Sequence, residues 1–456
     1  MAETIDVVVV GMGPGGEFVA GQLAEAGLAV LGIDAHLVGG ECPYYGCVPS
    51  KMMIRAADAL AEGRRIPSLA GASEVRPDWS PVAARIRAEA TDNWNDQVAV
   101  DRFVTKGGRF VRGRARITGP RTVLVDDREE FTAERAIVIN SGTRPAIPPI
   151  TGLEGTPFWT NREAIAAQRA PESLLVVGGG AIGVELAQAF ARFGTQVEIV
   201  ESAPRLLSGE EPEASELLSD VLADEGLVIH TDVQVGSASH STDGFTIDLG
   251  GSRRNAEQLL IATGREAELG ALGVGSLGVD IKAKFLDPDG RMRIADGVYA
   301  IGDVTGKGAF THVSMYQAAI ATKDILGQAL HEAEYHAVPR VTFTDPEVGA
   351  VGLTERQARE KGVPTRIGKA DLPGSARGWI HKAGNAGFIK LVEDADRGVL
   401  VGATAAGPYG GEVLGALALA VHAEVLTDRL RQMIYAYPTF HRAIEDALST
   451  LGAPAS

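Results

Sequence analysis

The strongest constraint on the fold is a pattern that occurs twice along the chain. Residues 6–27 read DVVVVGMGPGGEFVAGQLAEAG, and residues 174–194 read LLVVGGGAIGVELAQAFARFG. In each, a β-branched apolar run meets Gly-x-Gly-x-x-Gly, and a segment with helical periodicity then ends at a glycine. A second apolar run follows and ends in an acid, Asp34 or Glu201, 18 residues beyond the third glycine. One signature could be a glycine-rich turn, but this ordered set occurring twice predicts two dinucleotide-binding units.

The glycines of each signature have distinct expected roles. The first forms the tight turn, the second lets backbone amides approach a pyrophosphate, and the third lets the helix pack closely. In chain order they are Gly11, Gly13 and Gly16 in the first unit and Gly178, Gly180 and Gly183 in the second.

The rest of the chain carries further elements. Helical stretches at 51–62 and 81–100 and short strands around 109–140 are predicted between the two units. Both units close on a similar strand, IVINSGTRP at 137–145 and LLIATGR at 259–265, and GVYAIGDV follows at 297–304.

From about residue 336 the pattern changes to alternating strands and helices, which predicts a separate α+β domain of about 120 residues. Its expected helices lie at 354–361, 411–424 and 427–434.

Cys42 and Cys47 are the only cysteines among 456 residues, and they lie in ECPYYGCVPSK. The N-terminal IDVVVVG has no signal-peptide pattern, so a cytoplasmic protein is expected and a structural disulfide is not. The pair therefore indicates redox or metal chemistry, and two thiols without a histidine-rich neighbourhood are too few ligands for a metal.

Charge and hydropathy exclude two classes of partner. The 43 basic and 59 acidic residues give a formal charge of -16, which disfavours nucleic acid and anionic membrane surfaces. The longest late apolar stretch, residues 415–426, contains His and Glu and is too short to cross a bilayer.

Several motifs together resemble those of the pyridine nucleotide-disulfide oxidoreductases, and the resemblance spans nearly the whole chain. GGECPYYGCVPSK resembles the family's redox-active segment, GGGAIGVE its nicotinamide nucleotide site, YAIGDV its second FAD site and VTFTDPEVGAVGLTE the start of its dimerisation domain. The resemblance implies an α/β fold of two Rossmann-like nucleotide-binding domains, for FAD and NAD(P), with a C-terminal α+β dimerisation domain, in a homodimer. The expected segments are 1–150 and 268–335 for FAD, 151–267 for NAD(P) and 336–456 for dimerisation.

The resemblance also implies the cofactor sites. FAD is expected on the first unit, with Asp34 accepting from the adenosine ribose, Asp303 binding the ribityl chain and the backbone of Ala115 contacting the adenine. Further FAD-lining positions are Gly11, Gly13, Gly16, Gly40, Lys51, Gly142 and Gly302. The nicotinamide nucleotide is expected at Gly178, Gly180, Ile182, Gly183, Glu185, Glu201 and Gly264.

Glu201 bears on the choice of nucleotide. A carboxylate that accepts from the ribose 2′-OH repels a 2′-phosphate, so NADH is expected and NADPH is disfavoured. Arg205, four residues on, could soften that preference.

By the family's pattern, a hydride passes from NADH to FAD and the electrons then reduce a Cys42–Cys47 disulfide. Cys47 is expected against the flavin and Cys42 as the exposed thiol that attacks the substrate. Lys51, about one helical turn past Cys47, is expected near the flavin and paired with Glu185.

The chain departs from the family at the proton-transfer site. Tyr437 in AYPTFHRAIED stands where the family's reductases have histidine, and Arg442 stands where they have glutamate. Tyrosine is a poor general base near neutral pH but donates a hydrogen bond. His441, one turn along the same predicted helix, could substitute with Glu445 or Asp446 as its orienter, or could be an interface histidine.

Two further departures concern the flavin and the thiols. Ala181 stands where the family often has an aromatic gate over the flavin. Glu41 replaces a common threonine, and Pro43-Tyr44-Tyr45 replaces Leu-Asn-Val. An acid beside the interchange thiol disfavours its thiolate.

These departures weaken the case for dihydrolipoamide or glutathione as substrate, and the absence of a C-terminal cysteine pair disfavours mercury. The sequence predicts an enzyme that reduces a disulfide or another thiol-reactive small molecule. Two alternatives stay open: an NAD(P)H:quinone or other acceptor reductase acting at the flavin, and a nucleotide-binding redox sensor without turnover.

Overall fold

The computed structural model describes residues 3–328 and 331–452, which form two compact units. The first unit comprises Met1–Ser50, Ala84–Ala146 and Gly264–Tyr335, and the second comprises Lys51–Ala83, Ile147–Thr263 and His336–Ser456. Helix α3 (Cys47–Arg65) carries the chain from the first unit into the second.

An eight-stranded sheet forms the centre of the first unit. Its main path runs β16-β17-β6-β1-β2-β3, and a β4-β5 hairpin pairs with β6. Along this path every neighbouring pair from β17 to β3 is parallel, whereas β16 pairs antiparallel with β17. The strands are β1 (Glu3–Val10), β2 (Val30–Asp34), β3 (Arg109–Arg112), β4 (Ala115–Gly119), β5 (Thr122–Val125), β6 (Glu129–Ile139), β16 (Arg293–Ala295) and β17 (Val298–Ala300).

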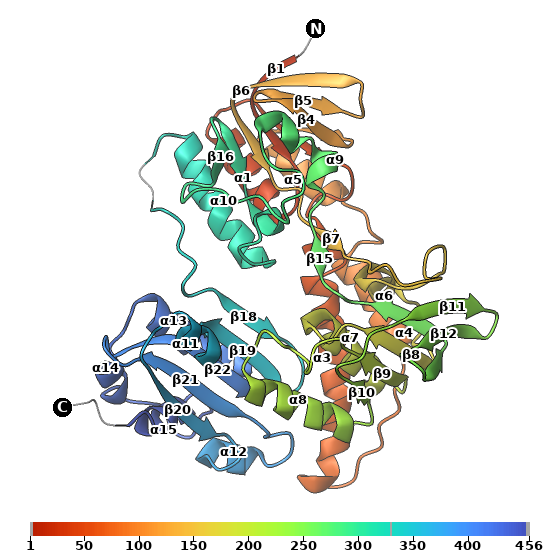
Figure 1. The fold of residues 1–456 in the computed structure, drawn as a ribbon, viewed down its shortest axis with the longest axis vertical. Coiled ribbons are helices and arrows are strands. Elements are labelled where there is room, and N and C mark those ends of the chain that lie inside the picture. Colours follow the sequence, from red (N-terminus) through yellow and green to blue (C-terminus); the bar gives the residue numbers. More distant parts are fainter. Residues whose placement is uncertain (1–2, 329–330, 453–456) are drawn as a thin grey trace. The chain divides into compact units, whose positions relative to one another are not determined.

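Both faces of this sheet are covered, which explains the unbroken valine run in β1. Val7 and Val9 pack with helix α1 (Pro14–Glu25) and helix α10 (Thr311–Ile325) on one face. Val8 and Val10 pack on the opposite face with residues of β4, β5 and α9 (Leu269–Leu272). Figure 1 shows α1 and α10 beside each other at the sheet. A strand buried on both faces needs apolar side chains at every position.

A four-stranded parallel sheet, β10-β9-β8-β14, forms the first half of the second unit. Helix α7 (Ala181–Arg192) connects β8 to β9, and α8 (Pro212–Asp224) precedes β10. A three-stranded antiparallel sheet β11-β12-β13 and helix α6 (Asn161–Ala166) complete this part. The strands are β8 (Ser173–Val177), β9 (Gln196–Val200), β10 (Val228–His230), β11 (Ser237–Ser241), β12 (Gly244–Asp248), β13 (Arg253–Ala256) and β14 (Gln258–Ile261).

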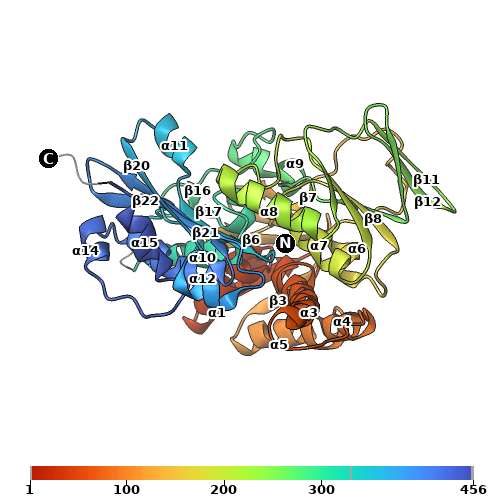
Figure 2. The same cartoon turned by 90° about the horizontal axis from the view of Figure 1, so that it is seen from below.

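The C-terminal half of the second unit is a five-stranded antiparallel sheet, β18-β19-β22-β21-β20, with α13 and α15 packed on its apolar face. Figure 2 shows α15 close to β20 and β21. The strands are β18 (Pro339–Thr342), β19 (Glu347–Gly352), β20 (Thr365–Asp371), β21 (Phe388–Asp394) and β22 (Val399–Gly407). The helices are α11 (Glu355–Glu360), α12 (Ala376–His381), α13 (Gly410–His422), α14 (Thr427–Arg431) and α15 (Ala443–Ser449).

A buried lysine joins the two halves of the second unit. The Lys390 side chain on β21 is 3% exposed, and its Nζ lies 2.9 Å from Glu211, 2.7 Å from Glu213 and 2.8 Å from Glu355. Glu211 and Glu213 flank the start of α8, whereas Glu355 opens α11. Burial alone would lower the pKa of Lys390, but the hydrogen bonds to these carboxylates raise it, so the ammonium stays charged.

The predicted fold class is confirmed, with both βαβ units and the C-terminal α+β domain in place. The helix predicted over 81–100 is wrong in its middle. Helix α4 (Ser80–Arg85) passes into a π-helical turn (Ile86–Ala90), and α5 (Gln97–Thr105) starts only after a break. The limits of the four domain segments predicted from the sequence stay predictions.

Among residues 3–328 and 331–452, no helix combines the length and the apolar composition that a membrane-spanning helix needs.

Candidate active site

The first glycine signature folds as a tight turn beneath helix α1. Gly11 has φ +93°, and a Cβ there would lie 2.3 Å from the Asn140 carbonyl oxygen. A Cβ on Gly16 would lie 2.0 Å from the Gly11 carbonyl oxygen, so the helix packs as closely as predicted. Asp34, at the end of β2, accepts the Met12 N–H at 2.7 Å and thereby holds the turn. Burial raises the pKa of Asp34.

The second signature repeats this geometry. Gly178 has φ +110°, with a Cβ position 2.4 Å from the Ala262 carbonyl oxygen, and a Cβ on Gly183 would lie 2.0 Å from the Gly178 oxygen. Glu201, directly after β9, accepts the Gly179 N–H at 2.6 Å and the Ala203 N–H at 2.7 Å. Each acid therefore fastens the glycine turn of its own unit.

Both helices that follow these turns begin at a glycine, Gly13 for α1 and Gly180 for α7, and neither has a side-chain hydrogen bond at its N-cap. A Cβ on Gly180 would meet nothing within 4 Å. The first-turn amides and the positive end of each helix are therefore available to a phosphate. The turns fit a pyrophosphate-bearing cofactor in each unit.

A second polar cluster of the first unit surrounds Asp303. Its carboxylate accepts a hydrogen bond from Thr143 Oγ1 at 3.1 Å, and Arg265 donates to the same hydroxyl at 2.8 Å and to the Thr143 carbonyl at 2.7 Å. Burial raises the pKa of Asp303, and the nearby Arg265 guanidinium opposes that rise. Arg265 also lies 3.7 Å from Glu41. The acid beside Cys42 is thus accompanied by a cation, which offsets its expected effect on the thiol.

The other predicted FAD positions are spread around the same unit. Gly40 (φ +67°) is the N-cap of α2 (Glu41–Tyr44). Gly302 has φ +78°, and a Cβ added there would lie 2.7 Å from Asn140 Oδ1. Gly142 has φ +66° in the loop after β6, and Ala115 is the buried first residue of β4.

The two cysteines flank one short turn. Cys42 lies in α2 and is half-buried, whereas Cys47 is the exposed first residue of the 19-residue helix α3, so the exposure of the two thiols is the reverse of the expected order. The Cys47 sulfur lies 3.4 Å from Oγ1 of Thr311, the first residue of α10. A helix N-terminus and a hydroxyl both favour a thiolate at this sulfur.

Lys51 is four residues beyond Cys47 in α3, and its Nζ lies 2.8 Å from Glu185 Oε2. The other Glu185 oxygen accepts the Phe343 N–H at 2.8 Å, and the Lys51 ammonium lies 4.6 Å from the Phe343 ring centre. Glu185 is 6% exposed. The predicted pair is therefore present and is held from a third element.

An ion network beneath this pair fixes α3 against α7. The Arg192 side chain is 2% exposed and bonds Asp58 at 2.6 Å, Glu225 at 2.6 Å and Asp345 at 2.8 Å. Arg65, at the end of α3, also bonds Asp345 at 2.6 Å. Burial raises the pKa of Asp58 to about 6, and Arg192 opposes that rise.

The expected proton-transfer segment is not helical. Tyr437 is 70% exposed, and helix α15 begins only at Ala443, so the prediction that Tyr437 and His441 share a helix is wrong. The backbone from 437 to 442 forms turns instead. His441 Nε2 lies 3.5 Å from Thr439 Oγ1.

The carboxylates expected to orient His441 bind another partner. Glu445 lies 3.0 Å and Asp446 3.6 Å from the Arg442 guanidinium. Because an i,i+3 or i,i+4 pair on a helix lies on one face, the charged arginine takes both acids.

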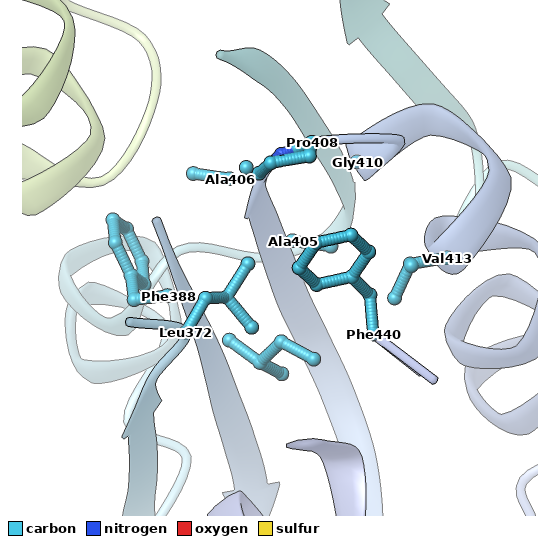
Figure 3. A pocket seen from close by; sticks show the side chains of 10 residues that line it. Leu372, Phe388, Ala405, Ala406, Pro408, Gly410, Val413 and Phe440 are labelled. Atoms are coloured by element: carbon cyan, nitrogen blue, oxygen red, sulfur yellow. The ribbon is translucent and has the colours of Figure 1, made fainter. Parts of the chain in front are cut away.

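Phe440 anchors this segment. Its ring is 6% exposed and lines an apolar pocket of the C-terminal domain, next to Ala405 and Val413 (Figure 3). The ring also contacts Tyr409 and His381, with centroid distances of 6.0 and 5.4 Å. The pocket is lined by carbon, which suits a packing role for Phe440.

Ile182 is exposed in the first turn of α7, and its contact to a nucleotide stays a prediction. Gly264 opens the last segment of the first unit, and its carbonyl accepts the Ala146 N–H at 2.9 Å. Arg205 donates to the Leu207 and Ser208 carbonyls, which tethers its guanidinium to its own loop. Across the described ranges 3–328 and 331–452, no group of three or more His, Cys, Asp or Glu side chains could hold a metal ion.

Three residues that the sequence did not reveal now join the site: Thr143, Arg265 and Thr311. The similarity of IVINSGTRP to LLIATGR marked the segments of the first two. No local signal marked Thr311, because its partner Cys47 is 264 residues away.

Two dinucleotide-binding folds, a thiol pair at a helix start and a lysine paired with a buried glutamate define a nucleotide-dependent dithiol oxidoreductase. The family model described as pyridine nucleotide-disulphide oxidoreductase matches residues 5–320, and the model of that family's dimerisation domain matches residues 338–448. The chain belongs to the pyridine nucleotide-disulphide oxidoreductase family. It is an FAD-dependent disulfide oxidoreductase that uses a pyridine nucleotide.

Relatives of known activity cover the whole chain. Dihydrolipoyl dehydrogenase of Chlorobaculum tepidum is 32% identical, with 99% of each chain covered. Mercuric reductase of Acidithiobacillus ferrooxidans is 29% identical over 98% of this chain and 83% of its own. The HOCl-induced flavoprotein disulfide reductase RclA of Escherichia coli superposes with a TM-score of 0.85 at 25% identity, covering 97% of this chain and 99% of its own.

Proposed function

We propose that this enzyme passes electrons from NADH through FAD to a Cys42–Cys47 disulfide and on to a small-molecule disulfide or another thiol-reactive electrophile. The observation that carries this proposal is the arrangement at the start of α3. Cys47 opens the helix within 3.4 Å of a hydroxyl, Cys42 lies in the preceding turn, and Lys51 is paired with a buried glutamate one turn on.

The chain's own residues have distinct tasks in this reaction. Gly11, Gly13, Asp34 and Asp303 would hold FAD, which relays two electrons from the nicotinamide to the disulfide when it is bound. Glu185 holds the Lys51 ammonium in place through their 2.8 Å contact. Lys51 lies four residues beyond Cys47 on α3, so the cation follows the thiol by about one helical turn.

The substrate step is a pair of thiol–disulfide exchanges. The Cys42 thiolate attacks one sulfur of the substrate disulfide, forms a mixed disulfide and releases the first thiol. The Cys47 thiolate then attacks Cys42, restores the Cys42–Cys47 disulfide and releases the second. One NADH and one proton are consumed, and two thiols are formed.

The preference for NADH rests on Glu201. Its carboxylate is fixed by the Gly179 and Ala203 amides at the end of β9, where a 2′-phosphate would meet its charge. Arg205 donates to carbonyls of its own loop, which makes it a weak counter-charge.

We also propose a cytoplasmic homodimer. The dimerisation-domain match supports it, and so do large exposed apolar side chains on that domain: Trp379 (77%), Tyr409 (57%) and Ile434 (96%). Tyr437 and His441 lie on the same domain and are the proposed proton-transfer candidates. Because the usual base is replaced, an acceptor that forms a good leaving thiolate suits this site better than one that needs general-acid help.

The test is an anaerobic NADH titration of the FAD-loaded wild type and of Cys42→Ser, followed by absorbance. Uptake of more than two electrons and a long-wavelength thiolate-to-flavin charge-transfer band are expected for the wild type. Reduction that ends at two electrons, or normal turnover of every acceptor by Cys42→Ser, would refute the disulfide route. Reduction of quinones at the flavin would then be the favoured function.

A further inference from the structure

The segment after α4 contains two rare backbone conformations in succession. A π-helical turn spans Ile86–Ala90, and the following Asp92, Asn93 and Trp94 have φ values of 46°, 55° and 57°. Aspartate and asparagine tolerate the left-handed region, but three consecutive residues in it are unusual and a tryptophan is disfavoured there. Such backbone persists only where the surroundings impose it.

Buried hydrogen bonds impose this turn. Thr91, 1% exposed, donates its hydroxyl to the Arg87 carbonyl at 3.1 Å and accepts the Trp94 N–H at 3.3 Å. The Asn93 N–H reaches back to the Arg87 carbonyl at 2.7 Å. Asp96 then accepts the Val38 N–H at 2.6 Å, which ties the end of the turn to the loop before α2.

The turn aims Trp94 at the cysteine segment. Its indole stacks on the Tyr45 ring with a centroid distance of 6.4 Å and an interplanar angle of 27°. Tyr45 follows α2, and its N–H still makes the helical bond to the Glu41 carbonyl at 2.8 Å. Tyr45 is thus three residues beyond Cys42, and although its own backbone (φ -139°) is no longer helical, this hydrogen bond keeps it close to the turn that carries the thiol.

Trp94 also has a hydrogen-bond donor, the indole N–H. Its Nε1 is buried and has no hydrogen-bond acceptor among the residues that the structure describes. A buried indole N–H normally has an acceptor, so its position favours a group that brings one.

We propose that Tyr45 and Trp94 form an aromatic wall beside Cys42 that selects electron acceptors carrying a planar aromatic group with a hydrogen-bond acceptor at its edge. This inference rests on the proposed attack by Cys42 and names the substrate class for it. The aromatic surface extends from Tyr45, in the turn that carries the thiol, to the indole of Trp94. The indole N–H is the donor for the acceptor at the edge of the substrate's ring. Aromatic disulfides, whose thiolates leave readily, also suit a site without the usual base.

The test uses the FAD-loaded enzyme, reduced with NADH and mixed anaerobically with one of two acceptors. Bis(carboxy-nitrophenyl) disulfide carries planar aromatic rings, and bis(hydroxyethyl) disulfide is aliphatic. The second-order rate constant for reoxidation of the dithiol is measured for the wild type, Trp94→Leu, Trp94→Phe and Tyr45→Leu. Val98→Ala, a change at an exposed residue of α5, is the matched control.

Trp94→Leu and Tyr45→Leu should slow the aromatic acceptor by about tenfold, and Trp94→Phe, which keeps a ring but loses the N–H, by about threefold. The aliphatic acceptor and the rate of flavin reduction by NADH should stay within about twofold of wild type. Equal slowing of the reaction with both acceptors, or no slowing in any variant, would contradict the proposed aromatic wall. Failure of the disulfide route itself shows separately, as unchanged reoxidation of Cys42→Ser by both acceptors.

Discussion

Replacing Arg192 of α7 with methionine removes the cation that is shared by three carboxylates, those of Asp58 on α3, Glu225 and Asp345. Asp58 and Glu225 lose their arginine, and Asp345 keeps only its 2.6 Å bond to Arg65. Removing one member of a buried ion pair costs about 3–5 kcal/mol, because the remaining charge is left without a counter-ion. At roughly 2–4 °C per kcal/mol, the thermal midpoint should fall by on the order of 10 °C.

Arg192→Lys should recover part of this loss, since an ammonium can serve one or two carboxylates but lacks the guanidinium fork. Arg356→Met is the control, because Arg356 pairs with Glu360 on the exposed face of α11, where such a pair contributes less than about 1 kcal/mol.

The deficit of Arg192→Met should also depend on pH. The pKa of Asp58 is already raised to about 6, so ionising this group opposes folding as pH rises through that value. Without Arg192 that pKa rises further, and protonation relieves part of the strain in acid. The deficit should therefore be smaller at pH 5 than at pH 8.

Differential scanning calorimetry and the release of flavin fluorescence at both pH values measure these effects. Midpoints for Arg192→Met within about 2 °C of wild type at pH 8, or a deficit that grows in acid, would refute the assignment of this network as the clamp between the two helices.

Three further outcomes are expected. Thr311→Val should move the pH at which the charge-transfer band of the reduced enzyme develops upward by up to ~1 unit, because the Cys47 thiolate loses a donor, while Thr311→Ser should match wild type; an unmoved band would remove the hydroxyl from the site. Glu201→Gln should raise the NADPH to NADH ratio of kcat/KM by roughly tenfold, since the charge leaves but an acceptor oxygen stays; an unchanged ratio would contradict the role of the carboxylate. Tyr437→Phe and His441→Ala should each be compared with wild type by pH-rate profile, with the residue that serves in proton transfer changing the profile; two unchanged profiles would exclude both.

Local patterns carried most of what the sequence could reveal. The turn, helix and closing acid of each nucleotide unit lie within 30 residues, and backbone geometry alone dictates their glycines. The Lys51–Glu185 contact spans 134 residues, yet each partner lay in a recognisable motif. The same applied to the two cysteines.

Contacts between residues that lie in no local motif could not be predicted from the sequence. Nothing near FTHVS indicates that Thr311 meets Cys47, and nothing in residues 86–96 indicates a left-handed turn that stacks Trp94 on Tyr45. Helical periodicity continued across that break, but the Thr91 hydroxyl offered the backbone other hydrogen bonds, and Asp92 and Asn93 tolerate the left-handed region. Residues 437–442 lie outside α15, and there the Thr439 hydroxyl donates to the Ala436 carbonyl at 2.7 Å.

The lysine buried between Glu211, Glu213 and Glu355 has an evolutionary consequence. A nucleotide-binding segment grafted onto an unrelated partner that covers the same surface would leave Glu211, which is 2% exposed in this chain, with no cation at its side. A C-terminal half grafted onto an unrelated partner would strand Lys390 in the same way. The two halves can therefore be inherited or exchanged only together, so any natural chimera of this enzyme should have its crossover outside residues 211–390.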